Sequence, residues 1–166
     1  MAASYANYNA DVTRTLPVSG KFTKRQRDVY NAVLRVQRAS IKGATIGKLH
    51  RDWQKEAQRM MNEELLKLRL ITKDDIKKQT DDRPACWKYF PHGLGHSLGL
   101  DVHDYGWTME PFKEGWVITV EPGIYIPKEG FGVRLENNIV IRKGGNEDLT
   151  AGIPIDAEEV EDLMHS

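Results

Sequence analysis

The sequence predicts a fold of the α+β class, in which two helices pack on a curved, mainly antiparallel sheet. The first half of the chain has two stretches with apolar residues at helical spacing, whereas the second half has short runs rich in β-branched and aromatic residues between Gly and Pro breaks. Helices and strands that are segregated along the chain favour this class. With 166 residues, 40% of them hydrophobic, the chain fits a single domain spanning residues 1–166.

The predicted elements begin at the N-terminus. The stretch SYANYNADVTRTL alternates between two faces and predicts a strand that starts almost at residue 1 and ends before Pro17. Thr23 followed by Gln26 is typical of a capping box and predicts a helix from Thr23 to Lys42. Gly43 then ends this helix.

A second, longer amphipathic helix is predicted after Gly43, with Thr45 as its cap and Leu68 as its last periodic apolar residue. The charged segment TKDDIKKQTDDRP has no periodicity and predicts no regular element. Beyond it, WVITVEPGIYI and FGVRLENNIVIRK predict strands. The terminal DAEEVEDLM predicts a short acidic helix capped by Asp156.

The overall composition excludes several classes of function. Lys plus Arg and Asp plus Glu both number 24, so the net charge gives no reason to expect nucleic acid or an anionic membrane as a partner. Cys86, the one cysteine, cannot form an internal disulfide. The sequence has neither a recognisable N-terminal leader nor an apolar run long enough to cross a bilayer, so we expect a soluble, cytoplasmic protein.

The segment HGLGHSLGLDVHD, residues 92–104, holds three of the five histidines. His92 and His96 are four residues apart and would share a face of a helix or of a strand, but the three glycines in the segment disfavour a helix. A site strand is one interpretation of this pattern. The alternative is a turn-rich loop whose histidines are solvated or bonded to the backbone.

Three acidic residues elsewhere have a similar ambiguity. Glu121 lies within an apolar run, where an unpaired carboxylate is costly to bury, although an exposed strand end would also accommodate it. Alternation in GVRLENNIVI puts Arg134 and Glu136 on the same face. A solvated ion pair is the alternative there, and an exposed strand face is the alternative for Asp11.

If Asp11, His96, Glu121 and Glu136 converge, they supply three carboxylates and one imidazole. That donor set suits Mn²⁺, Co²⁺, Fe²⁺ or Zn²⁺ rather than a thiolate zinc cage. Such an ion makes a water more acidic and polarises a carbonyl, and a neighbouring glutamate can transfer the proton to the leaving amine. The convergence would therefore predict peptide-bond hydrolysis.

Four segments in this order, ADVTRTLPVSGKFTKRQRDVYNAV, HGLGHSLGLDVHD, VITVEPGIYIP and GVRLENNIVI, resemble aminopeptidase P, the Xaa-Pro aminopeptidases of the pita-bread metallopeptidase superfamily. The resemblance covers nearly the whole chain. It implies half of a pita-bread fold, equivalent to the second half of the catalytic domain, with the N-terminal domain and the first half-domain absent. It also implies cleavage between an N-terminal residue and proline.

The resemblance also implies roles for individual residues. Asp11, His96, Glu121 and Glu136 match metal ligands of the family, which holds two divalent ions, usually manganese. Glu121 matches the residue that also handles the proton. His92 and His103 match the substrate-side histidines, and Arg134 matches an arginine near the bridging glutamate; we therefore expect these three residues and Glu121 to be catalytic.

One ligand of the family has no match, because the family's first aspartate would fall before Met1. We therefore expect one metal ion rather than two, and weakened peptidase activity. An uncovered half-domain surface would favour a homodimer or a complementing half-domain. The alternatives are a non-catalytic peptide-binding or interaction module, and an inactive fragment.

Overall fold

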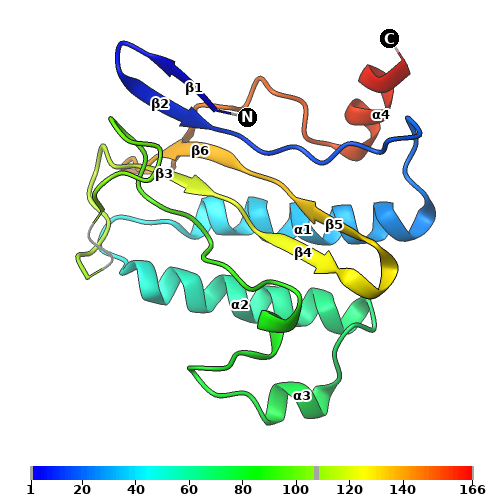
Figure 1. Cartoon of the computed structure of the whole chain (residues 1–166). Helices are drawn as coiled ribbons and strands as arrows, with labels where there is room; N and C mark the ends of the chain where they lie inside the picture. The colour runs from blue at the N-terminus through cyan, green and yellow to red at the C-terminus, as the bar shows by residue number, and fades with distance from the viewer. Residues whose placement is uncertain (1, 107–108, 166) are drawn as a thin grey trace.

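The computed structural model describes residues 2–106 and 109–165. Two long helices, α1 (Lys24–Gly43) and α2 (His50–Lys67), run antiparallel to each other. Helix α1 packs against the strands, and α2 packs against α1 (Figure 1). The predicted α+β class, with two helices on antiparallel strands, is confirmed.

The strands form a bent ribbon. Strand β3 (Val117–Val120) pairs antiparallel with β6 (Asn137–Val140), which also pairs with β7 (Glu147–Asp148). Strand β4 (Gly123–Ile126) pairs antiparallel with β5 (Phe131–Arg134). The two pairs are continuous, since β3 leads into β4 through Pro122 and β5 leads into β6 through Leu135, whose N–H donates to the Pro122 carbonyl.

The main core lies between the ribbon and the helices. Its members are apolar residues of α1, α2 and the inner faces of the strands, among them Val29, Val33, Trp53, Val120 and Leu135, all at most 1% exposed. The helical periodicity placed the first three on the inner faces of α1 and α2. Val120 and Leu135, which each directly precede a glutamate in the sequence, face the core because successive side chains of a strand alternate between its two faces.

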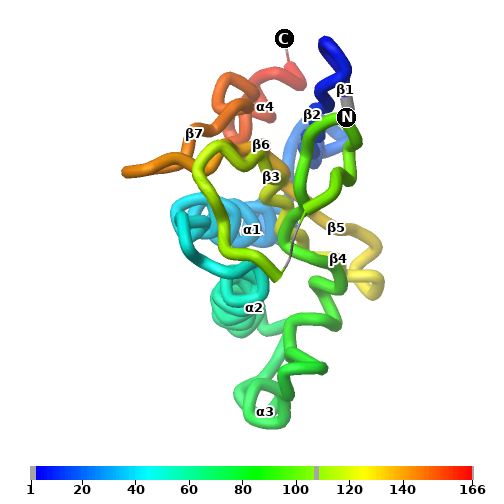
Figure 2. The backbone as a smooth tube through the Cα atoms, turned by 90° about the vertical axis from the view of Figure 1, so that its left-hand side faces the viewer, coloured from blue at the N-terminus to red at the C-terminus, as the bar shows by residue number. Residues whose placement is uncertain are grey.

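The N-terminus is a hairpin rather than the single strand that the sequence predicted. Strand β1 (Ala2–Tyr5) and β2 (Tyr8–Asp11) pair antiparallel, with Tyr5 opposite Tyr8. Ala6 and Asn7 have φ values of 49° and 64°, so both are left-handed, as a two-residue hairpin turn requires. The alternating pattern cannot reveal this turn because no Gly or Pro interrupts it. Figure 2 shows the hairpin and α4 at one end of the molecule and α3 at the other.

The helix predictions are correct for α1 and only partly correct for α2. Thr23 caps α1, and its capping box with Gln26 is present. Helix α2 begins at His50 instead of after Thr45, and its N-cap residue, Leu49, makes no side-chain cap. The predicted Thr45 cap is therefore wrong. The backbone at Thr45 forms a turn, in which its carbonyl accepts from the Lys48 N–H.

The charged segment after α2 does contain a helix, α3 (Lys73–Lys77), which the sequence analysis did not predict. Thr72 and Asp75 form its capping box. The predicted C-terminal helix is present as α4 (Ala157–His165). Two 3₁₀ turns, η1 (Ala85–Lys88) and η2 (Pro127–Glu129), complete the helical elements of the described residues, and none of the described helices is long and apolar enough to cross a membrane.

Residues 92–104 do not form a regular strand, which was one of the two interpretations of their pattern. They run along the free edge of β3 with a single bridge, Ser97 to Ile118. The His96 carbonyl accepts from the Thr119 N–H at 2.9 Å, and the Leu94 carbonyl accepts from the Glu121 N–H at 2.8 Å. The segment is therefore an irregular edge whose backbone is nonetheless held against the ribbon.

Candidate metal centre

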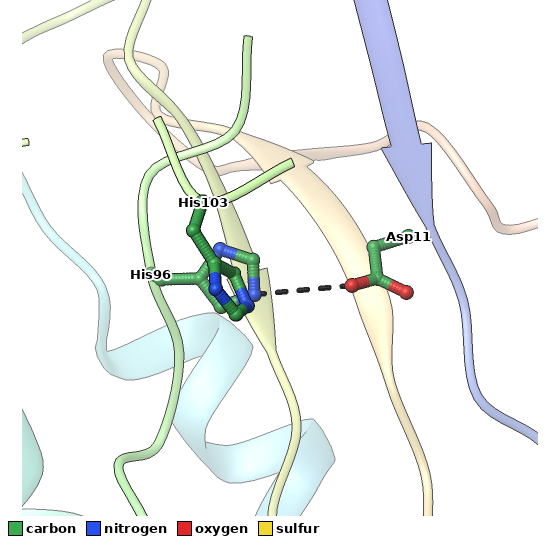
Figure 3. A group of neighbouring side chains, drawn as sticks. All are labelled: Asp11, His96 and His103. Carbon is green, nitrogen blue, oxygen red and sulfur yellow. Dashed lines mark ion pairs between the residues drawn. The ribbon is translucent and has the colours of Figure 1, made fainter. Parts of the chain in front are cut away.

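Four chain segments bring the expected ligands together. His96 comes from the irregular edge, Glu121 from the end of β3, Glu136 from the start of β6, and Asp11 from the end of β2. Ligand atoms of His96, Glu121 and Glu136 lie within 4.8 Å of one another, and so do those of Asp11, His96 and His103. Figure 3 shows Asp11 facing the two histidines across the site.

His96 lies at the centre of the cluster. Its Nδ1 donates to the Ser97 carbonyl at 3.0 Å, which leaves the lone pair on Nε2. That nitrogen lies 3.4 Å from Glu121 Oε1 and 3.9 Å from Asp11 Oδ2. The imidazole is therefore held in the tautomer that a metal ligand needs, with its free nitrogen among carboxylate oxygens.

Glu121 is mostly buried beside other acids. Its side chain is 16% exposed, and burial together with the charge of Glu136 raises the pKa of Glu121 to about 7. Arg134 opposes this shift by favouring the charged carboxylate, as does the hydroxyl of Thr119, which donates to Oε1 at 3.3 Å. A carboxyl with this pKa can both accept and release a proton near neutral pH.

Glu136 is the most deeply buried of the four, at 2% exposed. Its Oε2 accepts from the Thr13 hydroxyl at 2.5 Å, whereas Oε1 is buried without a hydrogen-bond partner in the described part of the chain. Thr13 Oγ1 in turn accepts from Arg134 Nε at 3.2 Å. Burial raises the pKa of Glu136, and Asp11 adds to the effect.

Asp11 is positioned through its backbone. Its N–H donates to the Asn138 side-chain oxygen at 3.0 Å, and the Asn138 amide donates back to the Asp11 carbonyl at 2.5 Å. Asn138 is 2% exposed, and these two bonds connect β2 to β6 at the level of the site.

The substrate-side residues predicted by resemblance lie next to this cluster. His103 is exposed, and its ring contacts His96 edge-on at a centroid distance of 4.2 Å. His92 uses both nitrogens: Nδ1 donates to the Gly93 carbonyl at 2.8 Å, and Nε2 accepts from the Tyr125 hydroxyl at 2.8 Å. Burial lowers the pKa of His92, so its imidazole is neutral at physiological pH.

The structure thus brings the four expected ligands into two overlapping groups that share His96, with His103 against His96 and Arg134 linked to Glu136 through Thr13. The donor set fits a hard divalent cation, because three carboxylates crowd together with one buried oxygen unpaired. Four further polar residues of the site, Thr13, Thr119, Tyr125 and Asn138, were not predicted from the sequence. The pattern marked these polar residues only as strand positions, and their partners come from distant segments.

Comparisons with known proteins identify the family of the chain. Residues 1–143 match the profile of metallopeptidase family M24. A Haemophilus influenzae Xaa-Pro aminopeptidase is 39% identical over 97% of this chain and 40% of its own length. The Xaa-Pro aminopeptidase of Escherichia coli is 41% identical over 96% of this chain and 38% of its own length. The chain thus spans about two fifths of the length of these relatives.

Solved structures give the same result for the fold. Proline aminopeptidase P II from Yersinia pestis superposes with a TM-score of 0.87 at 39% identity, covering 97% of this chain and 39% of that protein. A Bacillus anthracis protein described as a putative aminopeptidase P gives 0.85 at 36% identity, covering 96% and 36%. The expected half pita-bread fold and the resemblance to aminopeptidase P are confirmed, and the chain belongs to metallopeptidase family M24.

Proposed function

We propose that this chain carries the metal-binding half of a peptidase that hydrolyses the bond between an N-terminal residue and proline. The observation that carries the proposal is that His96 groups with Glu121 and Glu136 on one side and faces Asp11 on the other, while Oε1 of Glu136 is buried without a hydrogen-bond partner among the described residues. The named relatives are Xaa-Pro aminopeptidases, and they supply the substrate class.

One divalent ion, preferably Mn²⁺, is proposed for these four residues, with Co²⁺, Zn²⁺ or Fe²⁺ as substitutes. Carboxylate oxygens outnumber nitrogen donors three to one, which favours Mn²⁺ among these ions. When bound, the ion would supply Lewis-acid chemistry by polarising a peptide carbonyl and making a water more acidic. Crowding of the three carboxylates supports a cation at this position.

Glu121 is proposed to move the proton. Its carboxylate lies 3.4 Å from His96 Nε2, where it can take a proton from the attacking water and give it to the leaving nitrogen of proline. Thr119 holds Oε1 of Glu121, so the other oxygen is the one available for proton transfer. Arg134, bonded to Thr13, places positive charge beside Glu121 and Glu136 and limits how far their pKa values rise.

His92 and His103 are proposed to bind the peptide. His103 is exposed beside His96 and is the more accessible of the two. His92 has both nitrogens engaged, so it would contact substrate by exchanging its bond to Tyr125 for one to the peptide. The phenolic hydroxyl of Tyr125 would be released by the same exchange.

For the assembled protein, we propose residues 1–166 as one domain of a cytoplasmic enzyme. The domain would pack on a second copy of itself or on a complementing half-domain. The chain spans about two fifths of the length of these relatives. A non-catalytic peptide-binding module remains the second candidate, and the test below separates the two.

The test is hydrolysis of an Xaa-Pro tripeptide by the Mn²⁺-loaded chain, followed by detection of the released N-terminal amino acid. We expect slow turnover that disappears in Glu121→Gln and persists in Glu63→Gln, a matched change at an exposed glutamate. Peptide binding without turnover in all three proteins would support the binding module instead. Turnover that Glu121→Gln leaves unchanged would contradict the assignment of the proton to Glu121.

A further inference from the structure

Three side chains hold the backbone around His96, and none of them is a predicted metal ligand. The segment concerned is 94–96. On one side it faces the N-terminal end of α2, and on the other it lies along β3. Because His96 carries the one imidazole nitrogen that faces both Glu121 and Asp11, the position of this segment decides the geometry of the whole cluster.

The contacts from α2 are made by two residues one helical turn apart. Gln54 Oε1 accepts from the Leu94 N–H at 2.6 Å, and His50 Nε2 donates to the Gly95 carbonyl at 3.0 Å. Residues four apart share a helix face, so both side chains reach the same segment. The His50 ring also packs edge-on against Trp53 and Phe112, both at most 2% exposed, which fixes its orientation.

The contact from β3 is made by Thr119, which is fully buried between apolar neighbours. Its hydroxyl oxygen accepts from the His96 N–H at 3.0 Å and donates to Glu121 Oε1 at 3.3 Å. One hydroxyl therefore connects the backbone of one predicted ligand to the carboxylate of another. A valine, which strand propensity would favour here equally, could make neither bond.

Gly95 packs so closely against Thr119 of β3 that there is no room for a side chain at this position. A Cβ at that position would lie 2.0 Å from the Thr119 carbonyl oxygen and 3.2 Å from its hydroxyl. The backbone of the segment thus lies directly on β3 at Thr119, so a change in the Thr119 side chain is transmitted to His96 without an intervening group.

We infer that Thr119, His50 and Gln54 are positioning residues that hold His96, and through Thr119 also Glu121, in a metal-binding geometry before any ion is present. The inference rests on the proposed function, since it assigns the geometry to metal binding. Partners that orient metal ligands typically change metal affinity by about 10–100-fold when they are removed.

The test compares Thr119→Val, which keeps the shape and removes the hydroxyl, with Thr119→Ser, which keeps the hydroxyl. The first readout is Mn²⁺ affinity of the full chain by calorimetry. We expect Thr119→Val to weaken binding by about 10–100-fold, and Thr119→Ser to stay within about threefold of the unchanged chain. Gln54→Met, which removes the acceptor for the Leu94 N–H at a partly exposed position, should weaken binding by a smaller factor.

The second readout needs no metal and keeps the inference separate from the proposed function. Hydrogen exchange of the His96 amide in metal-free protein should be at least about tenfold faster in Thr119→Val than in Thr119→Ser. Amides in α1 should keep their exchange rates. If the chain binds no Mn²⁺, the proposed function fails, but this exchange difference still decides the role of Thr119. Equal His96 protection in the two variants, or uniform acceleration throughout the chain, would overturn the inference.

Discussion

The bent ribbon has two kinds of residue that alternate along the same strands, and they have opposite energetic roles. Val120 and Leu135 are fully buried among the apolar side chains that join the ribbon to the helices. Their immediate neighbours, Glu121 and Glu136, belong to a cluster of carboxylates with raised pKa values. The apolar layer stabilises the fold, whereas the carboxylate cluster opposes folding of the metal-free chain.

The largest expected effect is in the apolar layer. Leu135→Ala should reduce the free energy of unfolding by about 2–5 kcal/mol, because a fully buried leucine leaves a cavity that its neighbours only partly fill. Chemical denaturation of the metal-free chain measures this. Leu149→Ala, at a side chain that is 52% exposed, is the matched control and should change stability by less than about 0.5 kcal/mol. Equal losses of unfolding free energy in Leu135→Ala and Leu149→Ala would contradict the stabilising role of the apolar layer.

Gly95→Ala should give the next largest loss, about 1–3 kcal/mol, since the new methyl group would overlap the Thr119 carbonyl. This change lies where the two layers meet, so Mn²⁺ affinity should fall with stability. Gly152→Ala, where a Cβ would meet nothing within 4 Å, is the control for both measurements. Unchanged stability in Gly95→Ala would mean that the edge segment can move away from β3 freely.

Glu136→Gln should have the opposite sign to the change at the adjacent Leu135. Removing a buried charge beside Asp11 and Glu121 should stabilise the metal-free chain by on the order of 1 kcal/mol, or about 2–4 °C in Tm. The Thr13 hydroxyl can still donate to the amide oxygen of glutamine. Mn²⁺ binding should be lost in the same variant. A fall in Tm of the metal-free variant would show that the carboxylate stabilises the fold.

The pH dependence of stability sharpens the same contrast. Because the pKa of Glu121 is about 7 in the folded chain and near 4.5 when unfolded, the folded state holds more protons between these values. Stability of the metal-free chain should therefore decline as pH rises from about 4.5 to 7. Thermal unfolding of Glu121→Gln should show a smaller decline, because the raised pKa of Glu136 still contributes. A parent stability that rises across this window would contradict the raised pKa.

How well the sequence predicted these features follows from the range of the interactions. The Thr23 capping box and the apolar periodicity of α1 are local, and both were correct. The Ala6–Asn7 turn was missed because neither glycine nor proline marks it, and α3 was missed because its short capping box lies in a uniformly charged stretch. Helix α2 was placed too early because Thr45 is a suitable cap residue by type but turns away from the helix.

In the candidate metal site, too, local motifs were predicted from the sequence and long-range contacts were not. Motif resemblance identified Asp11, His96, Glu121 and Glu136, and the structure groups them. It did not identify Thr119, Asn138 or Gln54, whose hydrogen bonds to His96, Asp11 and Leu94 span 23 to 127 residues of sequence. No local pattern encodes such pairs, because a buried threonine or asparagine in a strand has the same alternation whether or not it supports a ligand.

The most direct test of the central claim is the number of Mn²⁺ ions bound per chain at equilibrium dialysis. The claim is that Asp11, His96, Glu121 and Glu136 form one divalent-metal site. We predict about one ion for the unchanged chain and none for His96→Ala. His165→Ala, a change at an exposed histidine of α4, should bind as the unchanged chain does. Equal binding by His96→Ala and the unchanged chain, or no binding by either, would contradict the claim.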